Sequence, residues 1–225
     1  MCGRFEIHAA LEIIARIFGI EASDVLIEYR PNYNAAPTND IPFVVKNGKR
    51  RLILCRWGFL PAWAKEEKTG FSMINARSET VAEKPAFREA FRKHRCIVPA
   101  DGFYEWRKAG TTRIPMHIHL RSKEPMGLAG LYSAWSSPEG ETICTCTIIV
   151  TNANKLVAPI HERMPVILHP ADYDRWLDPQ LQDVLSLQPL LKPYPPEELE
   201  MHAVSDKVNS PRNNSPDLIE PVGST

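Results

Sequence analysis

The sequence has no hydrophobic run of the roughly 20 residues that a helix needs to cross a bilayer. It also has no secretory signal peptide, because Arg4, Glu6 and Glu12 interrupt the first twenty residues. These absences weigh against membrane insertion and secretion. We therefore expect an intracellular protein without membrane partners.

The sequence has no net charge, since 27 Lys and Arg residues balance 27 Asp and Glu residues. Nucleic-acid-binding domains are often basic, so the overall charge weighs mildly against such a partner. The basic residues are unevenly spread, however. Residues 84–95 contain a single acidic residue, Glu89, and five basic ones: Lys84, Arg88, Arg92, Lys93 and Arg95. This segment is either a local basic face that steers a polyanion or an ordinary solvated helix face, and taken alone it favours the second.

The sequence lacks the even set of cysteines that is typical of small secreted proteins, because it has five in 225 residues. We therefore expect no disulfide framework. Cys55 and Cys96 lie in apolar runs and are predicted to be buried thiols. Cys144 and Cys146 would face the same side of a strand, but no second Cys/His pair with zinc-finger spacing accompanies them, so we predict no structural zinc.

The hydrophobic pattern predicts many strands and few helices. Asn47-Gly48 between two apolar runs indicates a hairpin of strands 41–46 and 51–57. The other strands are expected over 95–98, 103–107, 114–119, 127–133, 142–150 and 199–204. Helices are expected over 9–19, 84–93, 172–177 and 180–187, and an irregular loop over 30–42.

This order of elements has no βαβ alternation. It predicts an α+β fold: a single domain with a curved, mostly antiparallel β-sheet core and peripheral helices. We expect the domain to span residues 2–209. Residues 210–225 are rich in Pro, Asn and Ser and are predicted to form a surface or partly disordered C-terminal tail.

The first residues carry a reactive group if the initiator methionine is removed. The small residue at position 2 favours removal of Met1, which would leave Cys2 as an N-terminal 1,2-aminothiol. Its amine has an ordinary pKa of about 7.7–8.0 and its thiol one of about 8.5, so both are partly deprotonated near neutral pH. The amine can condense with an aldehyde to an imine, and the thiol can then close a thiazolidine ring. Alone, this is a weak signal.

Three polar residues stand beside apolar or aromatic ones in separate parts of the chain. Asn75 follows Met73-Ile74, Glu105 lies between Tyr104 and Trp106, and His161 follows Ile160. Such surroundings favour partial desolvation and shifted pKa values. Each residue alone would be interpreted as a hydrogen-bonded structural group.

Several segments, taken in order, resemble the SRAP (SOS response-associated peptidase) family, which crosslinks to abasic DNA. They run from residue 2 to about residue 209 and are Met1–Phe5, Tyr33–Thr38, Arg56–Pro61, Asn75–Glu79, Arg95–Trp106, His161–Pro165 and Val204–Asn209. The resemblance implies a sensor of abasic sites in single-stranded DNA that acts in the SOS response. It also implies a bacterial, cytoplasmic and nucleoid-associated protein, expected to be a monomer. Its protein partners, including any at the replication fork, stay open.

The resemblance also implies roles for single residues. Cys2 would form the thiazolidine with the ring-opened sugar, and Asn75 would hold the terminal amine. Glu105 would transfer protons near the amine and thiol, and His161 would assist sugar opening. These last two roles agree with the chemistry, because imine formation expels water and needs both a proton donor and an acceptor.

DNA contacts are expected from arginines and tryptophans. Arg77 and Arg163 would clamp phosphates, since a guanidinium binds phosphate oxygens bidentately, and Arg4 is a further candidate. The candidates for stacking on unpaired bases are Trp57, Trp63 and Trp106. The expected chemistry needs no cofactor and no metal. His117 and His119 would share a strand face, but no third ligand is evident, so a packed or surface pair is preferred to a metal site.

Other functions remain open at this point. A cysteine-dependent peptidase or autopeptidase would use the same four residues on a peptide carbonyl. A non-covalent single-stranded DNA-binding module would keep its activity without Cys2. An interaction module would show no preference for abasic DNA. Weak β-lyase activity is also expected, because an imine acidifies the neighbouring carbon–hydrogen bond.

Overall fold

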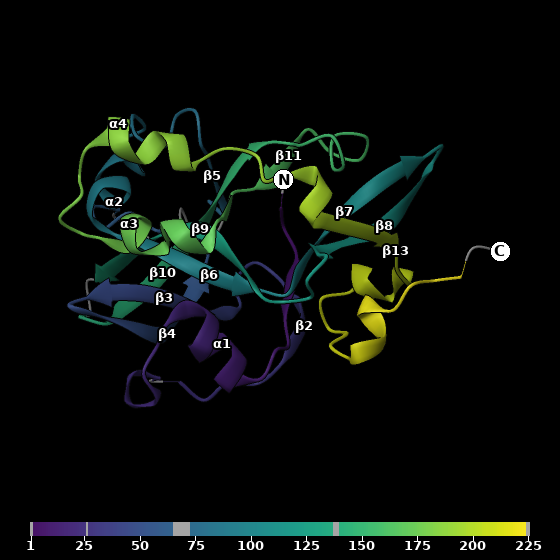
Figure 1. Cartoon of the computed structure of the whole chain (residues 1–225), viewed down its shortest axis with the longest axis horizontal. Coiled ribbons are helices and arrows are strands. Elements are labelled where there is room, and N and C mark those ends of the chain that lie inside the picture. The colour runs from purple at the N-terminus through teal and green to yellow at the C-terminus, as the bar shows by residue number, and fades with distance from the viewer. Residues whose placement is uncertain (1, 26, 65–72, 137–139, 224–225) are drawn as a thin grey trace.

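The structure is a computed structural model that describes residues 2–25, 27–64, 73–136 and 140–223. The described residues form a larger and a smaller β-sheet (Figure 1). The strands of the larger sheet are β3 (Asp40–Asn47), β4 (Lys49–Trp57), β5 (Asn75–Arg77), β6 (Arg95–Ala100), β9 (Met126–Ser136), β10 (Thr142–Asn152), β11 (Arg163–Pro165) and β12 (Ile167–Leu168). Those of the smaller sheet are β1 (Phe5–Ile7), β2 (Asn32–Ala35), β7 (Gly102–Ala109), β8 (Thr112–Leu120) and β13 (Leu199–Ala203).

The larger sheet closes on itself. Its order is β11-β10-β4-β3-β6-β9-β12, and an additional pairing of β10 with β9 joins the strands between them into a barrel. Within it, β10 runs parallel to β4 and to the short β5, while the other ladders are antiparallel. The expected α+β fold with a curved, mostly antiparallel core is therefore confirmed.

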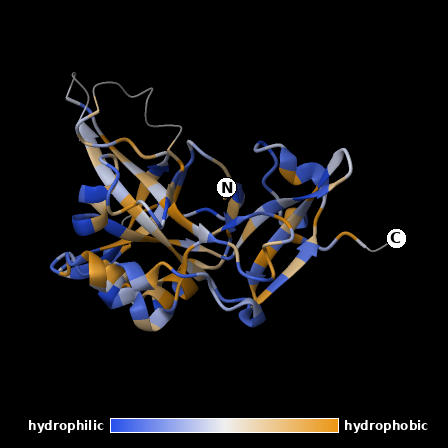
Figure 2. Ribbon diagram, turned by 90° about the horizontal axis from the view of Figure 1, so that it is seen from above, coloured by the Kyte–Doolittle hydropathy of each residue, from blue (hydrophilic) through white to orange (hydrophobic). Residues whose placement is uncertain are grey.

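The smaller sheet has the order β13-β8-β7-β1-β2. Its β1 follows directly from the N-terminal residues and pairs with both β2 and β7. Figures 1 and 2 both place the N-terminal end of the chain between the barrel and this sheet. The junction of the two sheets is thus where a group near residue 2 can meet residues from β7.

Helices are short and lie outside the sheets. The α-helices are α1 (Leu11–Phe18), α2 (Arg88–Lys93), α3 (Tyr173–Leu177) and α4 (Val184–Leu187). The 3₁₀ helices are η1 (Ala22–Asp24), η3 (Pro170–Asp172), η4 (Gln188–Leu190), η5 (Pro196–Glu198), η6 (Asp206–Asn209) and η7 (Pro216–Ile219). In the described ranges, every helix falls short of the length and apolarity that crossing a membrane requires.

Two turn signals act as the sequence predicts. Gly19 ends α1 with a φ of 61°, and Gly48 joins β3 to β4 with a φ of 72°, both in the left-handed region that glycine adopts without strain. The expected loop over 30–42 is wrong in part, because β2 and the start of β3 lie inside it. Pairing of β2 with β1 outweighs the local preference of its asparagines for turns.

Two predictions about single residues are also wrong. Arg95 does not belong to a solvated basic face: it is buried, and its guanidinium donates to carbonyls that include those of Phe91 and Trp176. Cys55 is not a buried thiol but forms a disulfide with Cys144. The parallel register of β4 and β10 brings these two cysteines together, with Cα atoms 5.0 Å apart.

The C-terminal segment packs more closely than its composition suggests. Leu218 of η7 is fully buried in a small apolar cluster with Tyr104, Val204 and Val208. Tyr104 also donates from its hydroxyl to the carbonyl of Tyr33 at 2.8 Å. Leu218 therefore anchors this segment, while most residues from 210 to 223 lie exposed on the surface.

Candidate active site

A polar cavity of about 520 Å³ lies between the two sheets and contains three of the residues singled out from the sequence. β7 contributes Glu105 and Trp106, and the segment leading into β11 contributes His161. The remaining lining residues are Lys108, Arg113, Ile160 and Glu162. Residues far apart in the chain thus meet at the sheet junction.

Glu105 is almost completely buried in the wall of this cavity. Burial raises the pKa of its carboxyl group, and His161 in its protonated form acts in the opposite direction. A carboxyl group with a raised pKa retains its proton closer to neutral pH, where it can give and take a proton.

His161 is held in one orientation by the backbone. The amide of Arg163 donates to its Nδ1 at 2.9 Å, and the carbonyl oxygen of the same residue lies 3.2 Å from this nitrogen. The shorter contact requires a lone pair on Nδ1, so the neutral ring that satisfies it carries its proton on Nε2, and the protonated ring can donate from Nε2. Glu105 and His161 together offer a proton acceptor and a proton donor in one cavity.

The Cys2 thiol is fully buried, and its Sγ lies 3.9 Å from the carbonyl oxygen of Arg4. Burial raises the pKa of this thiol well above its ordinary value, and the negative charge of Glu105 raises it further. The thiol therefore stays protonated near neutral pH.

Asn75 lies on β5, outside the set of residues that line the cavity. Its Nδ2 donates to the carbonyls of Ile74 at 3.0 Å and Ile148 at 3.4 Å. Its Oδ1 is buried and has no hydrogen-bond partner among the described residues. An unpaired buried oxygen is destabilising, which is typical of groups kept for function.

The two arginines predicted to clamp phosphates sit on opposite edges of β10. In the register, Val150 pairs with Arg77 of β5 on one side, and Asn152 pairs with Arg163 of β11 on the other. Arg77 is exposed, whereas Arg163 forms an ion pair with Glu79. Strands β5 and β11 thus flank β10, an arrangement that the sequence alone did not predict.

Arg4 has a structural environment. Its guanidinium donates to Oδ1 of Asn34 at 2.7 Å and to the carbonyls of Val208 at 2.8 Å and Asn209 at 3.2 Å. These bonds tie the N-terminal segment to η6. A contact from Arg4 to DNA would compete with all three.

The three candidate tryptophans have different surroundings. Trp57 is fully buried in the barrel core, so its prediction as a stacking residue is wrong. Trp63 is 66% exposed but lines a different cavity, next to Ala86 and His94. Trp106 lines the cavity of Glu105 and is held by a bond from its Nε1 to Oδ1 of Asn209 at 2.7 Å.

Sequence reasoning missed two cations in this cavity, Lys108 and Arg113. They stand directly opposite each other in the β7–β8 ladder, and like charges in such a pair destabilise a hairpin. An anion between them would remove that penalty. The alternation of the predicted strands could have aligned the two residues only if the hairpin register had been known.

Comparison with known proteins agrees with this fold. The family model described as SOS response associated peptidase (SRAP) matches residues 1–211. The chain is 48% identical over 222 residues to "Abasic site processing protein YoqW" of Bacillus subtilis (strain 168), covering 98% of this chain and 99% of that protein. It is 31% identical over 272 residues to "Abasic site processing protein HMCES" of Pongo abelii, covering 99% of this chain and 76% of that protein.

A crystal structure of a protein from Bacteroides thetaiotaomicron has the same fold, with a TM-score of 0.88 at 29% identity, covering 98% of this chain and 100% of that one. Fold and site therefore define an α+β protein with a candidate active site at the junction of its two sheets. The chain belongs to the SRAP family, and the resemblance drawn from its sequence motifs is confirmed.

Proposed function

We propose that this chain processes abasic sites in single-stranded DNA by a covalent thiazolidine crosslink through Cys2, once Met1 has been removed. The names of its relatives support the substrate. The observation that carries the proposal is that the buried Glu105 and His161 line one cavity. The charge of Glu105 also raises the pKa of the Cys2 thiol. The proposed setting is the bacterial cytoplasm, at the nucleoid, during the SOS response, with the protein acting as a monomer.

The reaction begins at the amine, because the Cys2 thiol has a raised pKa and stays protonated. The amine nitrogen adds to the aldehyde carbon of the ring-opened sugar and gives a carbinolamine. In its protonated imidazolium form, His161 donates a proton to the leaving hydroxyl, water departs, and an iminium ion forms that keeps its N–H proton. The thiol proton passes to the Glu105 carboxylate, and sulfur adds to the iminium carbon, which leaves a neutral ring nitrogen. The product is protein plus DNA minus one water.

Asn75 has the group needed to hold the amine. Its unpaired Oδ1 can accept a hydrogen bond from a terminal ammonium or amine. Removal of Met1 makes that amine part of Cys2. This step would satisfy a buried oxygen that is otherwise without a partner.

The DNA backbone is proposed to contact the cations at the cavity rim. Lys108 and Arg113 face each other across the β7–β8 ladder, where a phosphate would relieve their repulsion. Arg77 and Arg163 would hold further phosphates, and Trp106 would stack on an unpaired base. These contacts need no base sequence, as expected of a lesion sensor.

Peptidase and lyase activities would use the same residues. The family name favours a peptidase, but a buried thiol with a raised pKa is a poor nucleophile for a peptide carbonyl. Weak strand cleavage is proposed for variants that keep the amine and lack the thiol, because their imine cannot close to a thiazolidine.

The test uses Met1-processed protein and a labelled single-stranded oligonucleotide with one abasic site, resolved on a denaturing gel. A slower band is expected with this substrate. It should be absent with a tetrahydrofuran analogue, which has no aldehyde, and lost on Cys2→Ser. An equal band with the analogue, or one that survives Cys2→Ser, would refute the thiazolidine and favour a non-covalent or a different covalent function.

A further inference from the structure

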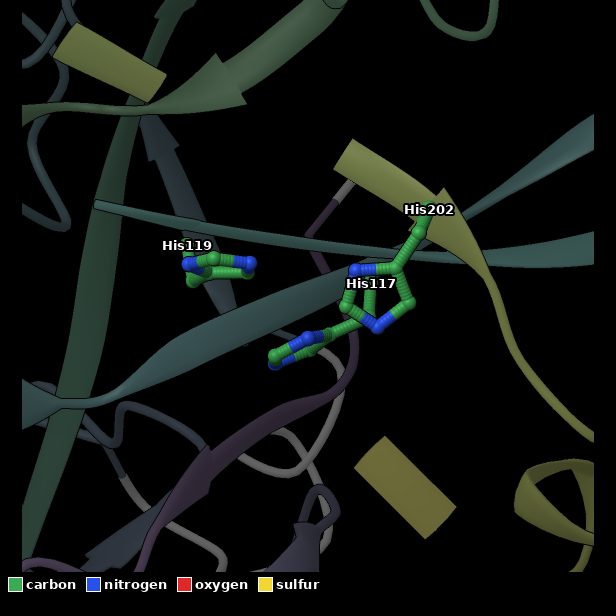
Figure 3. A group of neighbouring side chains, drawn as sticks. All are labelled: His117, His119 and His202. Atoms are coloured by element: carbon green, nitrogen blue, oxygen red, sulfur yellow. The ribbon is translucent and has the colours of Figure 1, made fainter. Parts of the chain in front are cut away.

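Three histidines gather on the smaller sheet, away from the cavity described above. His117 and His119 come from β8, and His202 comes from β13, where it pairs directly with His117. One ligand nitrogen from each ring lies within 4.8 Å of the other two. Figure 3 shows the three imidazoles facing a common space. The third ligand that the sequence did not reveal is thus supplied by β13.

Each ring has one nitrogen bound to an oxygen that can only accept a hydrogen bond from it. Nδ1 of His119 lies 2.8 Å from the carbonyl oxygen of Leu120, and Nε2 of His202 lies 2.8 Å from that of Ile219. Nε2 of His117 lies 3.1 Å from Oε1 of Glu6. Since the neutral rings donate at these positions, the opposite nitrogen of each ring carries a lone pair. Metal-binding histidines are held in this way by carbonyls and carboxylates.

The lone pair of His117 stands out because it is buried. Its Nδ1 has no hydrogen-bond partner among the described residues, and the side chain is only 5% exposed. A buried imidazole nitrogen without a partner is destabilising. A metal ion bound at Nδ1 would satisfy this nitrogen.

The backbone makes room for the pair formed by Glu6 and His117. A Cβ atom on Gly102 would lie 2.2 Å from Nε2 of His117 and 2.9 Å from Oε1 of Glu6. Glu6 is itself held by Nδ1 of His8 at 2.6 Å. The carboxylate that orients His117 is therefore fixed by its own neighbours.

The rings border a cavity of about 370 Å³ whose charge favours a cation. Its carboxylates come from Glu6, Asp101, Glu200 and Glu220, and they outnumber Lys123. The cavity leaves space for a water molecule as a fourth ligand.

This cluster is separate from the candidate active site, because the two cavities have no lining residue in common. The cluster is thus tested independently of the proposed DNA chemistry.

We propose that His117, His119 and His202 bind one divalent transition-metal ion of the zinc class, with Glu6 as the carboxylate that orients His117. Three imidazoles suit zinc, copper, nickel or cobalt, whereas magnesium and calcium prefer oxygen ligands. Nitrogens on one tetrahedral zinc ion are about 3.3 Å apart, from Zn–N distances of about 2.0–2.1 Å. Binding therefore draws the rings together by side-chain rotation. The ion would link β13 to β8. Because His202 also bonds to the carbonyl of Ile219, it would link the C-terminal segment to the same strands.

The test titrates Zn²⁺ by calorimetry and Co²⁺ by visible absorption into metal-stripped full-length protein. A Cys2→Ala background removes the N-terminal aminothiol, which could itself chelate metal. One ion per chain is expected. His119→Ala and His202→Ala should each weaken binding by more than the roughly 10–100-fold loss expected from Glu6→Gln. His169→Ala, which changes a histidine that stacks on Tyr194, is the matched control and should bind as the parent does.

Absence of binding, or binding that survives both His119→Ala and His202→Ala, would overturn the proposal. The Co²⁺ spectrum of the Cys2→Ala parent provides a second test without a further variant. A thiolate-to-cobalt charge-transfer band would place the ion on a cysteine and would also overturn the proposal. DNA adducts of processed protein should form in the presence of a chelator, so failure of either proposal can be recognised separately.

Discussion

Asn75 and Asn34 allow one substitution to be compared in two opposite environments. Asn34 is buried, and its Oδ1 accepts from the Arg4 guanidinium at 2.7 Å. Its Nδ2 donates to the carbonyls of Val208, Ser210 and Asn213 at 3.2, 3.0 and 3.0 Å. Asn75 makes only two such bonds, and its Oδ1 lacks a partner among the described residues. Replacement by alanine should therefore affect stability at one site and activity at the other.

The magnitudes follow from the bonds. A neutral hydrogen bond contributes about 1 kcal/mol net, and one to a charged group about 1.5–3 kcal/mol. Asn34→Ala should then lower the free energy of unfolding by about 3–5 kcal/mol. Asn75→Ala loses about 1–2 kcal/mol of bonding but also removes an unpaired buried oxygen that costs about 1–3 kcal/mol. Its net effect should lie between about 1 kcal/mol of destabilisation and about 2 kcal/mol of stabilisation.

The assay combines urea unfolding with the yield of abasic-site adduct, measured at a temperature where both variants are folded. Asn75→Ala should keep its stability and lose most of the adduct, whereas Asn34→Ala should lose stability and keep the adduct. Equal destabilisation by the two substitutions would refute the reasoning, because Asn75 would then be an ordinary structural residue.

Three further predictions concern charge. Glu105→Gln removes a negative charge that raises the pKa of the Cys2 thiol. It should speed alkylation of Cys2 in Met1-retaining protein by up to about tenfold for each unit by which the thiol pKa falls. Slower alkylation would contradict this influence of Glu105 on Cys2. Fluorescence anisotropy can measure how the affinity for undamaged single-stranded DNA depends on salt. Arg113→Ala should lower the slope of log affinity against log salt by about 0.7, whereas Arg92→Ala should leave it unchanged. A slope for Arg113→Ala equal to that of the parent would place the phosphate elsewhere. The hydrogen bond with Glu6 raises the pKa of His8. The stabilisation that protonated His8 provides is therefore complete below about pH 6.5 and is lost as pH rises through the raised pKa. In the presence of chelator, the difference in unfolding free energy between the parent and His8→Gln should shrink over that range, and a constant difference would disprove the linkage.

Local signals in the sequence were sufficient for much of the fold. Gly19 and Gly48 mark their turns because a positive φ is a local requirement that few other residues meet. Alternating apolar residues likewise predicted the strands of the β7–β8 hairpin. The closure of the barrel was not predictable, because the pairing of β10 with β9 and with β4 depends on registers between distant segments.

The same limit separates the residues that were predicted from those that were missed. Glu105 and His161 were found because each stands beside apolar neighbours in a motif, but their shared cavity required the fold. His202 had no local signal, since only the register of β13 against β8 brings it to His117. Arg95 looked like its exposed neighbours and was buried by contacts with Trp176, far along the chain.

Intact mass spectrometry under denaturing conditions tests the central claim most directly. Met1-processed protein is mixed with a single-stranded oligonucleotide carrying one abasic site, beside Cys2→Ala protein and an undamaged oligonucleotide. The account predicts a stable species at the mass of protein plus DNA minus one water, seen only with Cys2 and the lesion, and requiring no borohydride reduction. No such species from correctly processed protein, or an equally stable one from Cys2→Ala, would contradict the thiazolidine crosslink.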